Sequence, residues 1–275
     1  MRQMYRLIVW LIMLCLPLST LAFPREDRVP GGLAVIELKP TEGQSEFSFR
    51  GRPVLVVQRN ANSFALVGLP LNLKPGEYFI EASSNNSSGL LKKFFKVKNK
   101  EYSTQHITIK DKRKVNPYAK DMDRILAEKK RKQEASKLYS TNLPDVNFLL
   151  PLKGISTGSF GRRRVFNGQS RRPHSGMDIA ADTGTNIIAP ASGTVIEAGD
   201  FFFSGNLVYL DHGRGLISLY AHLNEINVSI GDTVEKGQII GKVGETGRVT
   251  GPHLHWSLGL NGTWINPELF LPIQE

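Results

Sequence analysis

The sequence predicts a mainly β protein with a small N-terminal β-sandwich, a connecting α-helix and a C-terminal antiparallel β domain. Three observations lead to this prediction. Short β-branched and aromatic runs alternate with Gly, Pro and Asn turns over residues 33–109, and the pattern returns from residue 148 onward. Residues 111–141 between them are rich in Lys and Arg and carry apolar residues at helical spacing. A chain of 275 residues is also long enough for two ordinary domains.

Residues 1–22 have the features of a secretory signal peptide. Arg2 and Arg6 give a positive start, and Leu7–Leu18 is apolar apart from one proline. Thr20-Leu21-Ala22 offers the small residues that a signal peptidase requires, so we expect cleavage after Ala22. The alternative is an uncleaved membrane anchor, but the run is short for a span of ~20 residues. We therefore expect an exported protein whose mature form has no stable membrane span.

The net charge indicates a class of partner, and the cysteine content indicates how the protein is stabilised. The formal net charge is +10, and removal of Arg2 and Arg6 leaves 10 − 2 = +8. A basic protein suits an anionic partner, and export makes nucleic acid an unsuitable one. Hydrophobic content of 40% and charged content of 22% are normal for a globular protein. The only cysteine is Cys15, so the mature chain cannot use disulfides and must be stabilised by packing.

We assign residues 23–110 to the N-terminal β-sandwich domain. Several short strands with regular turn signals favour a sandwich. His106 lies beside two β-branched residues, so we interpret it as an ordinary structural histidine. The expected strands cover residues 33–38, 53–57, 64–67, 77–82, 94–97 and 106–109.

Residues 111–145 form the predicted connecting helix and linker. Pro117 suits a first helical turn, and Tyr118, Met122, Ile125 and Leu126 recur on one face. The other face is basic, which leaves two interpretations. One is a solvated helix that lies along a domain, and the other is attraction to an anionic surface. The basic residues are Lys129, Lys130, Arg131, Lys132 and Lys137.

We expect residues 146–275 to form an antiparallel β domain whose loops carry the walls of a site. The sequence there is Gly-rich and β-branched, and it contains no convincing long helix. The expected strands cover residues 187–190, 193–199, 207–210, 216–220, 238–240 and 254–258.

The histidines between residues 174 and 255 indicate a catalytic metal centre. Side chains alternate along a strand, so His253 and His255 point to one face of the sheet. His174 and Asp178 are four residues apart, in a loop that runs into a strand. Two imidazoles and one carboxylate form a three-ligand zinc set that leaves a position for water. His222 has no obvious role as a fourth ligand, and it better suits proton transfer or stabilisation of an oxyanion.

Three motifs carry a strong resemblance to a known family. Pro173–Asp178, Tyr220–Leu223 and Gly251–Trp256, in this order, resemble those of M23 zinc metallopeptidases of the lysostaphin or LytM type. The resemblance covers roughly residues 148–271. The N-terminal half resembles, more loosely, the β-rich domain that precedes the peptidase in some Gram-negative members.

The resemblance implies a role for each of five residues. One Zn²⁺ ion would be bound by His174, Asp178 and His255, and the catalytic histidines would be His222 and His253. It also implies a periplasmic endopeptidase that hydrolyses peptide cross-links of peptidoglycan. By family analogy the target is the bond between D-alanine and diaminopimelate.

Further expectations concern the groove and the partners. Arg162 and Arg163 belong to an Arg-rich stretch that is either a solvated charged loop or a clamp on the carboxylates of an acidic stem peptide. Asn206 follows Phe201-Phe202-Phe203 and is added to the substrate-binding candidates. One or more of these Phe residues could line a groove wall, but we expect two to be buried and one exposed. A regulatory or adaptor protein is a further expected partner. The alternative function is a catalytically silent LytM-type activator of cell-wall amidases, against which the complete ligand set argues.

Overall fold

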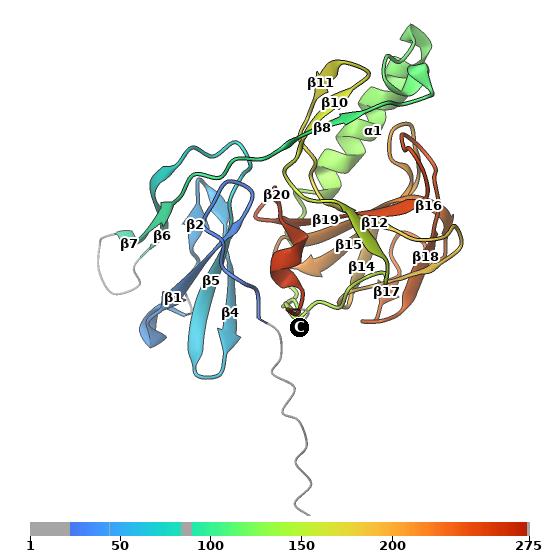
Figure 1. Ribbon diagram of the computed structural model, residues 1–275. Coiled ribbons are helices and arrows are strands. Elements are labelled where there is room, and N and C mark those ends of the chain that lie inside the picture. Colours follow the sequence, from blue (N-terminus) through green and yellow to red (C-terminus); the bar gives the residue numbers. More distant parts are fainter. Residues whose placement is uncertain (1–22, 44, 84–89, 274–275) are drawn as a thin grey trace, which may run out of the picture.

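The computed structural model describes residues 23–43, 45–83 and 90–273. The predicted signal peptide, residues 1–22, lies outside the described residues. Within them the chain is mainly β, as predicted, with two small sheets at the N-terminal end and a large sheet at the C-terminal end (Figure 1). None of the described helices combines the length and apolar character needed to cross a bilayer.

The N-terminal part is a sandwich of two antiparallel sheets. The three-stranded sheet has the order β1-β5-β4 and the four-stranded sheet the order β3-β2-β6-β7. An apolar layer that includes Ile36, Val67, Ile80 and Phe95 joins them. The strands are β1 (Leu33–Leu38), β2 (Ser48–Phe49), β3 (Arg52–Pro53), β4 (Leu55–Arg59), β5 (Asn62–Gly68), β6 (Gly76–Ser83) and β7 (Leu90–Val97).

The three-stranded sheet is buried on both faces. Ala65 and Val67 of β5 face the interior of the sandwich, whereas Leu66 between them joins the core of the C-terminal part. Asn261 bridges the two parts because its side chain bonds both the N–H (2.7 Å) and the C=O (3.2 Å) of Gly68. The two halves of the chain therefore pack on one continuous apolar core.

The C-terminal part is built on a ten-stranded sheet with the central order β17-β14-β15-β16-β19-β12-β9. The strand β18 pairs with β13 and β16, and β20 pairs with β19. The strands are β9 (Ile155–Gly158), β12 (Met177–Ala180), β13 (Asn186–Ile188), β14 (Gly193–Phe201), β15 (Gly205–Gly213), β16 (Leu216–Ile226), β17 (Thr233–Val234), β18 (Ile239–Val243), β19 (His253–Leu260) and β20 (Thr263–Ile265).

A third small sheet connects the N-terminal and C-terminal parts of the chain. The strand expected at residues 106–109 is β8 (Thr104–Ile107), and it pairs in parallel with β10 (Arg163–Phe166) rather than with the sandwich. β10 also forms a hairpin with β11 (Gln169–Arg171). The sequence gives no local signal for this pairing because the two parallel strands lie more than fifty residues apart.

The connecting helix α1 (Met122–Ala135) lies where a helix is expected, but the expected packing face is wrong. Tyr118, Met122 and Leu126 are exposed, while Glu128 is buried. Glu128 accepts hydrogen bonds from Arg124 (2.6 Å) and from the backbone N–H of Phe202 (2.8 Å). Charged and polar contacts therefore attach α1 to the large sheet, which a pattern of apolar residues cannot indicate. Four 3₁₀ helices complete the fold, at Pro40–Glu42, Lys112–Lys114, Ala119–Asp121 and Pro267–Phe270.

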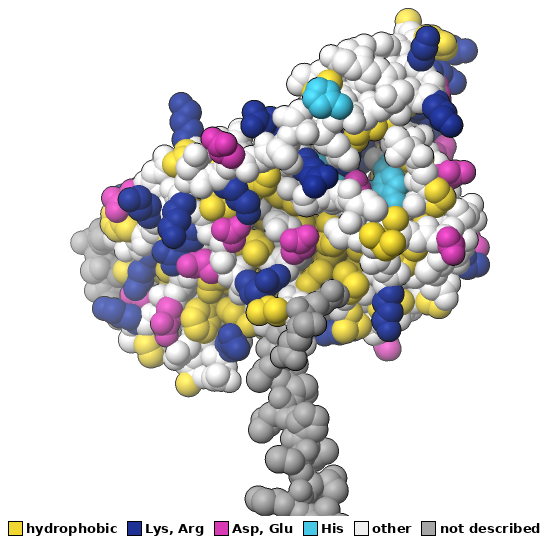
Figure 2. Space-filling view, viewed as in Figure 1, with side chains coloured by type: hydrophobic (Ala, Val, Ile, Leu, Met, Phe, Trp, Pro, Cys, Tyr) yellow, Lys and Arg dark blue, Asp and Glu magenta, His cyan; other side chains and the backbone are white. Residues whose placement is uncertain are grey.

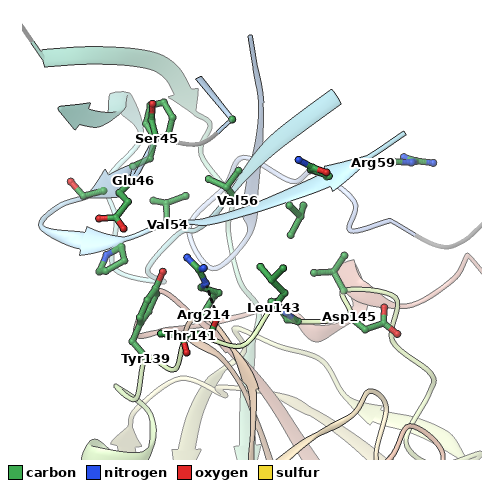
Figure 3. Close-up of a pocket in the computed structure, with 18 of the residues that line it drawn as sticks. Ser45, Glu46, Val54, Val56, Arg59, Tyr139, Thr141, Leu143, Asp145 and Arg214 are labelled. Carbon is green, nitrogen blue, oxygen red and sulfur yellow. Dashed lines mark hydrogen bonds between the residues drawn. The ribbon is translucent and has the colours of Figure 1, made fainter. Parts of the chain in front are cut away.

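A cleft of about 1290 Å³ lies between the sandwich and the segment that follows α1. Figure 3 shows Val54, Val56 and Arg59 on the sandwich side, opposite Leu143 and other residues of that segment. Its lining residues include no histidine, so the metal chemistry indicated by the sequence is not located in this cleft.

Candidate metal centre

Two neighbouring antiparallel strands bring the predicted metal ligands together. Asp178 on β12 stands directly opposite His255 on β19, and His174 lies in the loop that leads into β12. Asp178 Oδ1 is 2.9 Å from His174 Nε2 and 2.8 Å from His255 Nδ1, and the two nitrogens are 2.9 Å apart. These three residues form a group that could hold a metal ion.

The outer contacts of these side chains direct lone pairs toward a common point. His174 Nδ1 lies 3.0 Å from the carbonyl oxygen of Ser159, which can only accept, so Nδ1 carries the proton and Nε2 a lone pair. His255 Nε2 contacts Ser257 Oγ at 2.9 Å, and Asp178 Oδ2 accepts from Arg164 at 2.7 Å. His174 Nε2 and the carboxylate oxygen Asp178 Oδ1 therefore face each other as acceptors at 2.9 Å, and two acceptors repel unless a cation lies between them. The donor set therefore fits a metal ion, and the outer partners hold each ligand in position.

Burial sets the charge state of the group. His174 and Asp178 are buried, and His255 is partly buried. Burial lowers the pKa of His255 to about 4, so this imidazole is neutral at pH 7. Burial by itself raises the pKa of Asp178, but contacts with His174 and His255 outweigh it and hold the pKa well below its usual value. A neutral imidazole and an ionised carboxylate are the forms that bind a metal.

Gly158 makes room for the carboxylate. It pairs with Asp178 across β9 and β12. A Cβ atom at this position would lie 2.5 Å from Asp178 Oδ2, the oxygen that contacts Arg164. The absence of a side chain at residue 158 is therefore part of the site.

His222 and His253 lie beside the ligand group. Their ring centroids are 5.0 Å apart, and His253 Nε2 is 3.8 Å from Asp178 Oδ1. His222 Nδ1 donates to the carbonyl of Thr246 (2.8 Å) and His253 Nδ1 to that of Gly251 (2.9 Å). Both rings are thereby fixed in the tautomer with a lone pair on Nε2.

The backbone of His222 is held in an unusual conformation. Its φ of +69° lies in the left-handed region, which costs a non-glycine residue about 1–3 kcal/mol. The residue lies in β16 where the register with β15 and β18 is irregular. Burial lowers the pKa of His222 well below its usual value, and the nearby His253 and His255 act in the same direction to a smaller extent, so the ring stays neutral. A neutral imidazole in this position can accept a proton.

The group opens into a cleft of about 580 Å³ with basic walls. Figure 2 shows histidine side chains in a hollow on one face, with Lys and Arg groups nearby. The helix α1 supplies part of the wall, and the β10–β11 hairpin and Phe203 supply other parts. As expected, Phe201 and Phe202 are buried, and Phe203 lines the cleft. The cations that line it are Lys129, Lys132, Arg164, Arg171, Arg172 and Arg248.

The three substrate-binding candidates lie outside the residues that line this cleft. The backbone carbonyl of Arg162 accepts a hydrogen bond from the backbone N–H of His174 at 2.9 Å. Arg163 is exposed, and its Nε donates to the carbonyl of Tyr102 at 3.1 Å. The side chain of Asn206 donates to the carbonyl of Asn224 at 3.4 Å. The arginine that reaches the ligand group is their neighbour Arg164, so a substrate contact by these three residues stays a prediction.

Sequence reasoning assigned no role to three residues of the site, Ser257, Arg248 and Lys132. Ser257 could have been found, because it lies two residues after His255 on the same strand and therefore on the same face. Arg248 and Lys132 carried no such signal. They come from a loop and from α1, and only the tertiary structure places them in one cleft.

Comparisons with known proteins identify the family of the chain. The sequence model of Peptidase family M23 matches residues 172–267, and that of the Peptidase family M23 N-terminal domain matches residues 26–100. A crystal structure described as a peptidase M23 from Pseudomonas aeruginosa is 36% identical, with a TM-score of 0.74. That alignment covers 89% of this chain and 95% of the other.

Two curated relatives match the C-terminal part. The peptidoglycan DD-endopeptidase ShyA of Vibrio cholerae is 39% identical over 111 residues, which are 40% of this chain and 26% of that protein. The DD-carboxypeptidase/endopeptidase Mpg of Neisseria meningitidis is 43% identical over 105 residues, 38% of this chain and 24% of that protein. The matched segment thus spans about a quarter of the length of these relatives.

Proposed function

Because this chain belongs to peptidase family M23, we propose that it is an exported, zinc-dependent endopeptidase that hydrolyses peptide cross-links of bacterial peptidoglycan. The observation that carries the proposal is the convergence of three potential ligand atoms, His174 Nε2, Asp178 Oδ1 and His255 Nδ1, within 2.9 Å of one another. The peptidoglycan substrate is supported by the names of the relatives ShyA and Mpg.

His174, Asp178 and His255 would hold the ion. Two imidazoles and one carboxylate are a typical ligand set for catalytic zinc, which keeps a further position open. When bound, the ion supplies Lewis-acid polarisation of the scissile carbonyl and activation of water. Ser159, Ser257 and Arg164 keep the three side chains aimed at one point, so little reorganisation is needed when the ion binds.

His222 and His253 would handle protons during hydrolysis. Each ring presents Nε2 with a lone pair because Nδ1 is bonded to a backbone carbonyl. One ring can accept a proton from the attacking water, and a protonated ring can donate to the leaving amine. A protonated ring can also stabilise the negative charge that develops on the carbonyl oxygen.

The remaining assignments describe the layout of the exported enzyme. We propose a signal peptide at residues 1–22, an N-terminal domain at 23–110, a connecting segment at 111–145 and the peptidase domain at 146–275. The positive and apolar pattern of the first 22 residues supports export, which would place the enzyme in the periplasm beside its substrate.

The test is digestion of purified cell-wall sacculi by the metal-loaded protein, with and without a chelator. We expect cross-linked muropeptides to fall and monomers to rise, and the chelator to stop this change. An unchanged muropeptide profile from a sample with one bound zinc per chain would refute the proposal. If the protein is instead a catalytically silent regulator, the wild type and the His253→Ala variant should rescue a deletion strain equally well.

A further inference from the structure

We propose that Arg248 and Lys132 form a carboxylate-binding subsite beside the metal centre, and that this subsite selects peptides with a free carboxylate next to the scissile amide. The inference rests on the proposed function and names the chemical group by which the substrate is recognised. The two residues line the same cleft as His174, His222 and His255.

Arg248 contacts two aromatic rings. Its guanidinium carbon lies 4.6 Å from the ring centroid of Phe166 and 4.6 Å from that of Phe203. Within residues 23–43, 45–83 and 90–273, its side chain makes one hydrogen bond, from Nη1 to the carbonyl of Lys114 at 3.4 Å. A cation–π contact positions the guanidinium without supplying a hydrogen-bond acceptor. Among the described residues only Nη1 has such a partner, so the other N–H donors of Arg248 are left for a carboxylate.

Lys132 approaches from α1 on another side of the cleft. Its Nζ lies 3.4 Å from Ser204 Oγ. Burial lowers the pKa of this lysine, and the nearby Arg248 and Arg172 act in the same direction, while Glu128 opposes them. Glu128 does not neutralise it, since that carboxylate is engaged by Arg124 and by the backbone N–H of Phe202.

The cleft consequently holds an excess of positive charge, because Glu128 is the one carboxylate among its lining residues and six of them are Lys or Arg. Within the described part of the chain, no carboxylate lies within 4.0 Å of the charged groups of Arg248 or Lys132. Burial and the neighbouring Arg164 and Arg171 lower the pKa of Arg248 to about 10. An unpaired cation in a partly desolvated cleft is costly, and an anionic ligand removes that cost. Arg164 differs because Asp178 accepts its hydrogen bond.

The anionic group of a peptide ligand in this position is a carboxylate, which a guanidinium can bind through two parallel hydrogen bonds. In a cross-link between D-alanine and diaminopimelate, the carbon that bears the scissile nitrogen also bears a free carboxylate. The terminal D-alanine of an uncross-linked stem peptide has the same arrangement. The shared chemistry is thus a carboxylate on the carbon next to the leaving nitrogen, and experiment must separate the two sources.

The experiment compares a cross-linked muropeptide dimer that has free diaminopimelate carboxylates with the same dimer after their amidation. For the zinc-loaded wild type we expect kcat/KM to be at least 10-fold higher on the free carboxylate, mainly through KM. Arg248→Gln should lower kcat/KM for the free dimer to the kcat/KM for the amidated dimer. Arg248→Lys should retain part of the preference for the free carboxylate. Lys132→Gln should give a smaller loss in the same direction. Lys130→Gln, which removes a charge from the same helix outside the cleft lining, should keep the full preference.

Binding gives a second readout. Titration of both dimers into His253→Ala should give at least 10-fold weaker binding of the amidated form, and His253→Ala/Arg248→Gln should abolish the difference. A pentapeptide monomer with a free terminal carboxylate reports on the other source of the group. If Arg248→Gln weakens binding or cleavage of the dimer, the subsite recognises the carboxylate of diaminopimelate. If it weakens binding or cleavage of the pentapeptide alone, the subsite recognises a terminal carboxylate.

Two failures are distinguishable. The subsite is overturned, and the proposed function left intact, if the wild type cleaves and binds the free and amidated dimers equally well and Arg248→Gln does not affect the pentapeptide either. A zinc-loaded wild type that cleaves neither dimer refutes the proposed function itself. Thermal unfolding of each variant identifies loss of folding, in which case Lys132→Gln and Arg248→Lys carry the test.

Discussion

Asp178 Oδ1 lies 2.8 Å from Nδ1 of His255, although 77 residues separate them along the chain. The two residues stand opposite each other in the β12–β19 pair, so strand register fixes the distance between two predicted ligands. The five predictions below depend on this register or on the elements that surround it.

Replacement of the carboxylate should remove the metal. Asp178→Asn keeps the size of the side chain but loses the negative charge, so metal affinity should fall by more than the 10–100-fold typical of outer-shell changes. Metal content after dialysis and competition with a chelator would measure this. Asp182→Asn makes the same change at an exposed position four residues away and should bind metal like wild type. Retained tight binding by Asp178→Asn would show that the carboxylate is not a ligand.

The two flanking histidines should affect turnover and not metal binding. His253→Ala and His222→Asn should each lower kcat by about 10²–10⁴-fold, the usual contribution of a positioned proton-transfer group. Asn is chosen at residue 222 because it tolerates the left-handed φ of +69°. Steady-state kinetics on samples with matched metal content would measure the effect. Loss of metal from either variant would instead assign that histidine to the ligand group.

A single methyl group beside the carboxylate should disturb the site. Gly158→Ala would place Cβ 2.5 Å from Asp178 Oδ2, so either the strand or the carboxylate must move. We expect weaker metal binding with intact secondary structure, measured by chelator competition and circular dichroism. Gly251→Ala adds the same group where no heavy atom lies within 4 Å, so it serves as the control. Equal metal affinity of the two variants would contradict this account of Gly158.

The ion pair between Arg131 and Glu197 should contribute to the attachment of α1 to the large sheet. Arg131 Nε donates to the buried Glu197 at 2.9 Å, and a second guanidinium nitrogen contacts the same carboxylate. Arg131→Met would leave Glu197 without this partner and should lower the free energy of unfolding by about 1–3 kcal/mol. KM should rise as well, because α1 forms part of the cleft wall. Lys130→Met changes the exposed neighbour and should leave both the urea midpoint and KM unchanged.

Stability should fall with acidification through His212. Burial lowers the pKa of this imidazole to about 4, with Nδ1 donating to the carbonyl of Ser192 (2.8 Å). In the unfolded chain the ring takes up a proton near pH 6.5, whereas the folded chain resists protonation until about pH 4. Between these values the unfolded state binds more protons. Acidification therefore lowers the free energy of unfolding by up to about 1.4 kcal/mol per pH unit.

The comparison of wild type with His212→Asn isolates this contribution. Urea unfolding at several pH values from 7 to 4 should give a steeper decline for wild type than for the variant. The variant will be less stable at pH 7, because the hydrogen bond that Nε2 of the imidazole accepts from the Ser218 hydroxyl (2.7 Å) is lost. Parallel declines in the two proteins would mean that His212 does not contribute to the acid sensitivity.

Local sequence patterns were sufficient to predict much of the fold. The strands β1, β5, β6, β14 and β16 were predicted because β-branched runs and Gly or Pro turns act over a few residues. Interactions between distant segments were not predicted. β8 pairs with β10 through backbone groups, which carry no residue signature. The helix α1 is attached through Glu128 and Arg131, so its apolar pattern indicated a face that is exposed.

The sequence by itself determined which residue types are available for metal chemistry and on which face of a strand His253 and His255 lie, because alternation is a local property of the chain. Only the tertiary structure decided that Asp178 stands opposite His255 and that Arg164 orients the carboxylate. It also decided that Arg248 and Lys132 share the cleft. Strand register and the packing of a helix on a sheet depend on contacts between residues far apart in sequence, and no short motif records them.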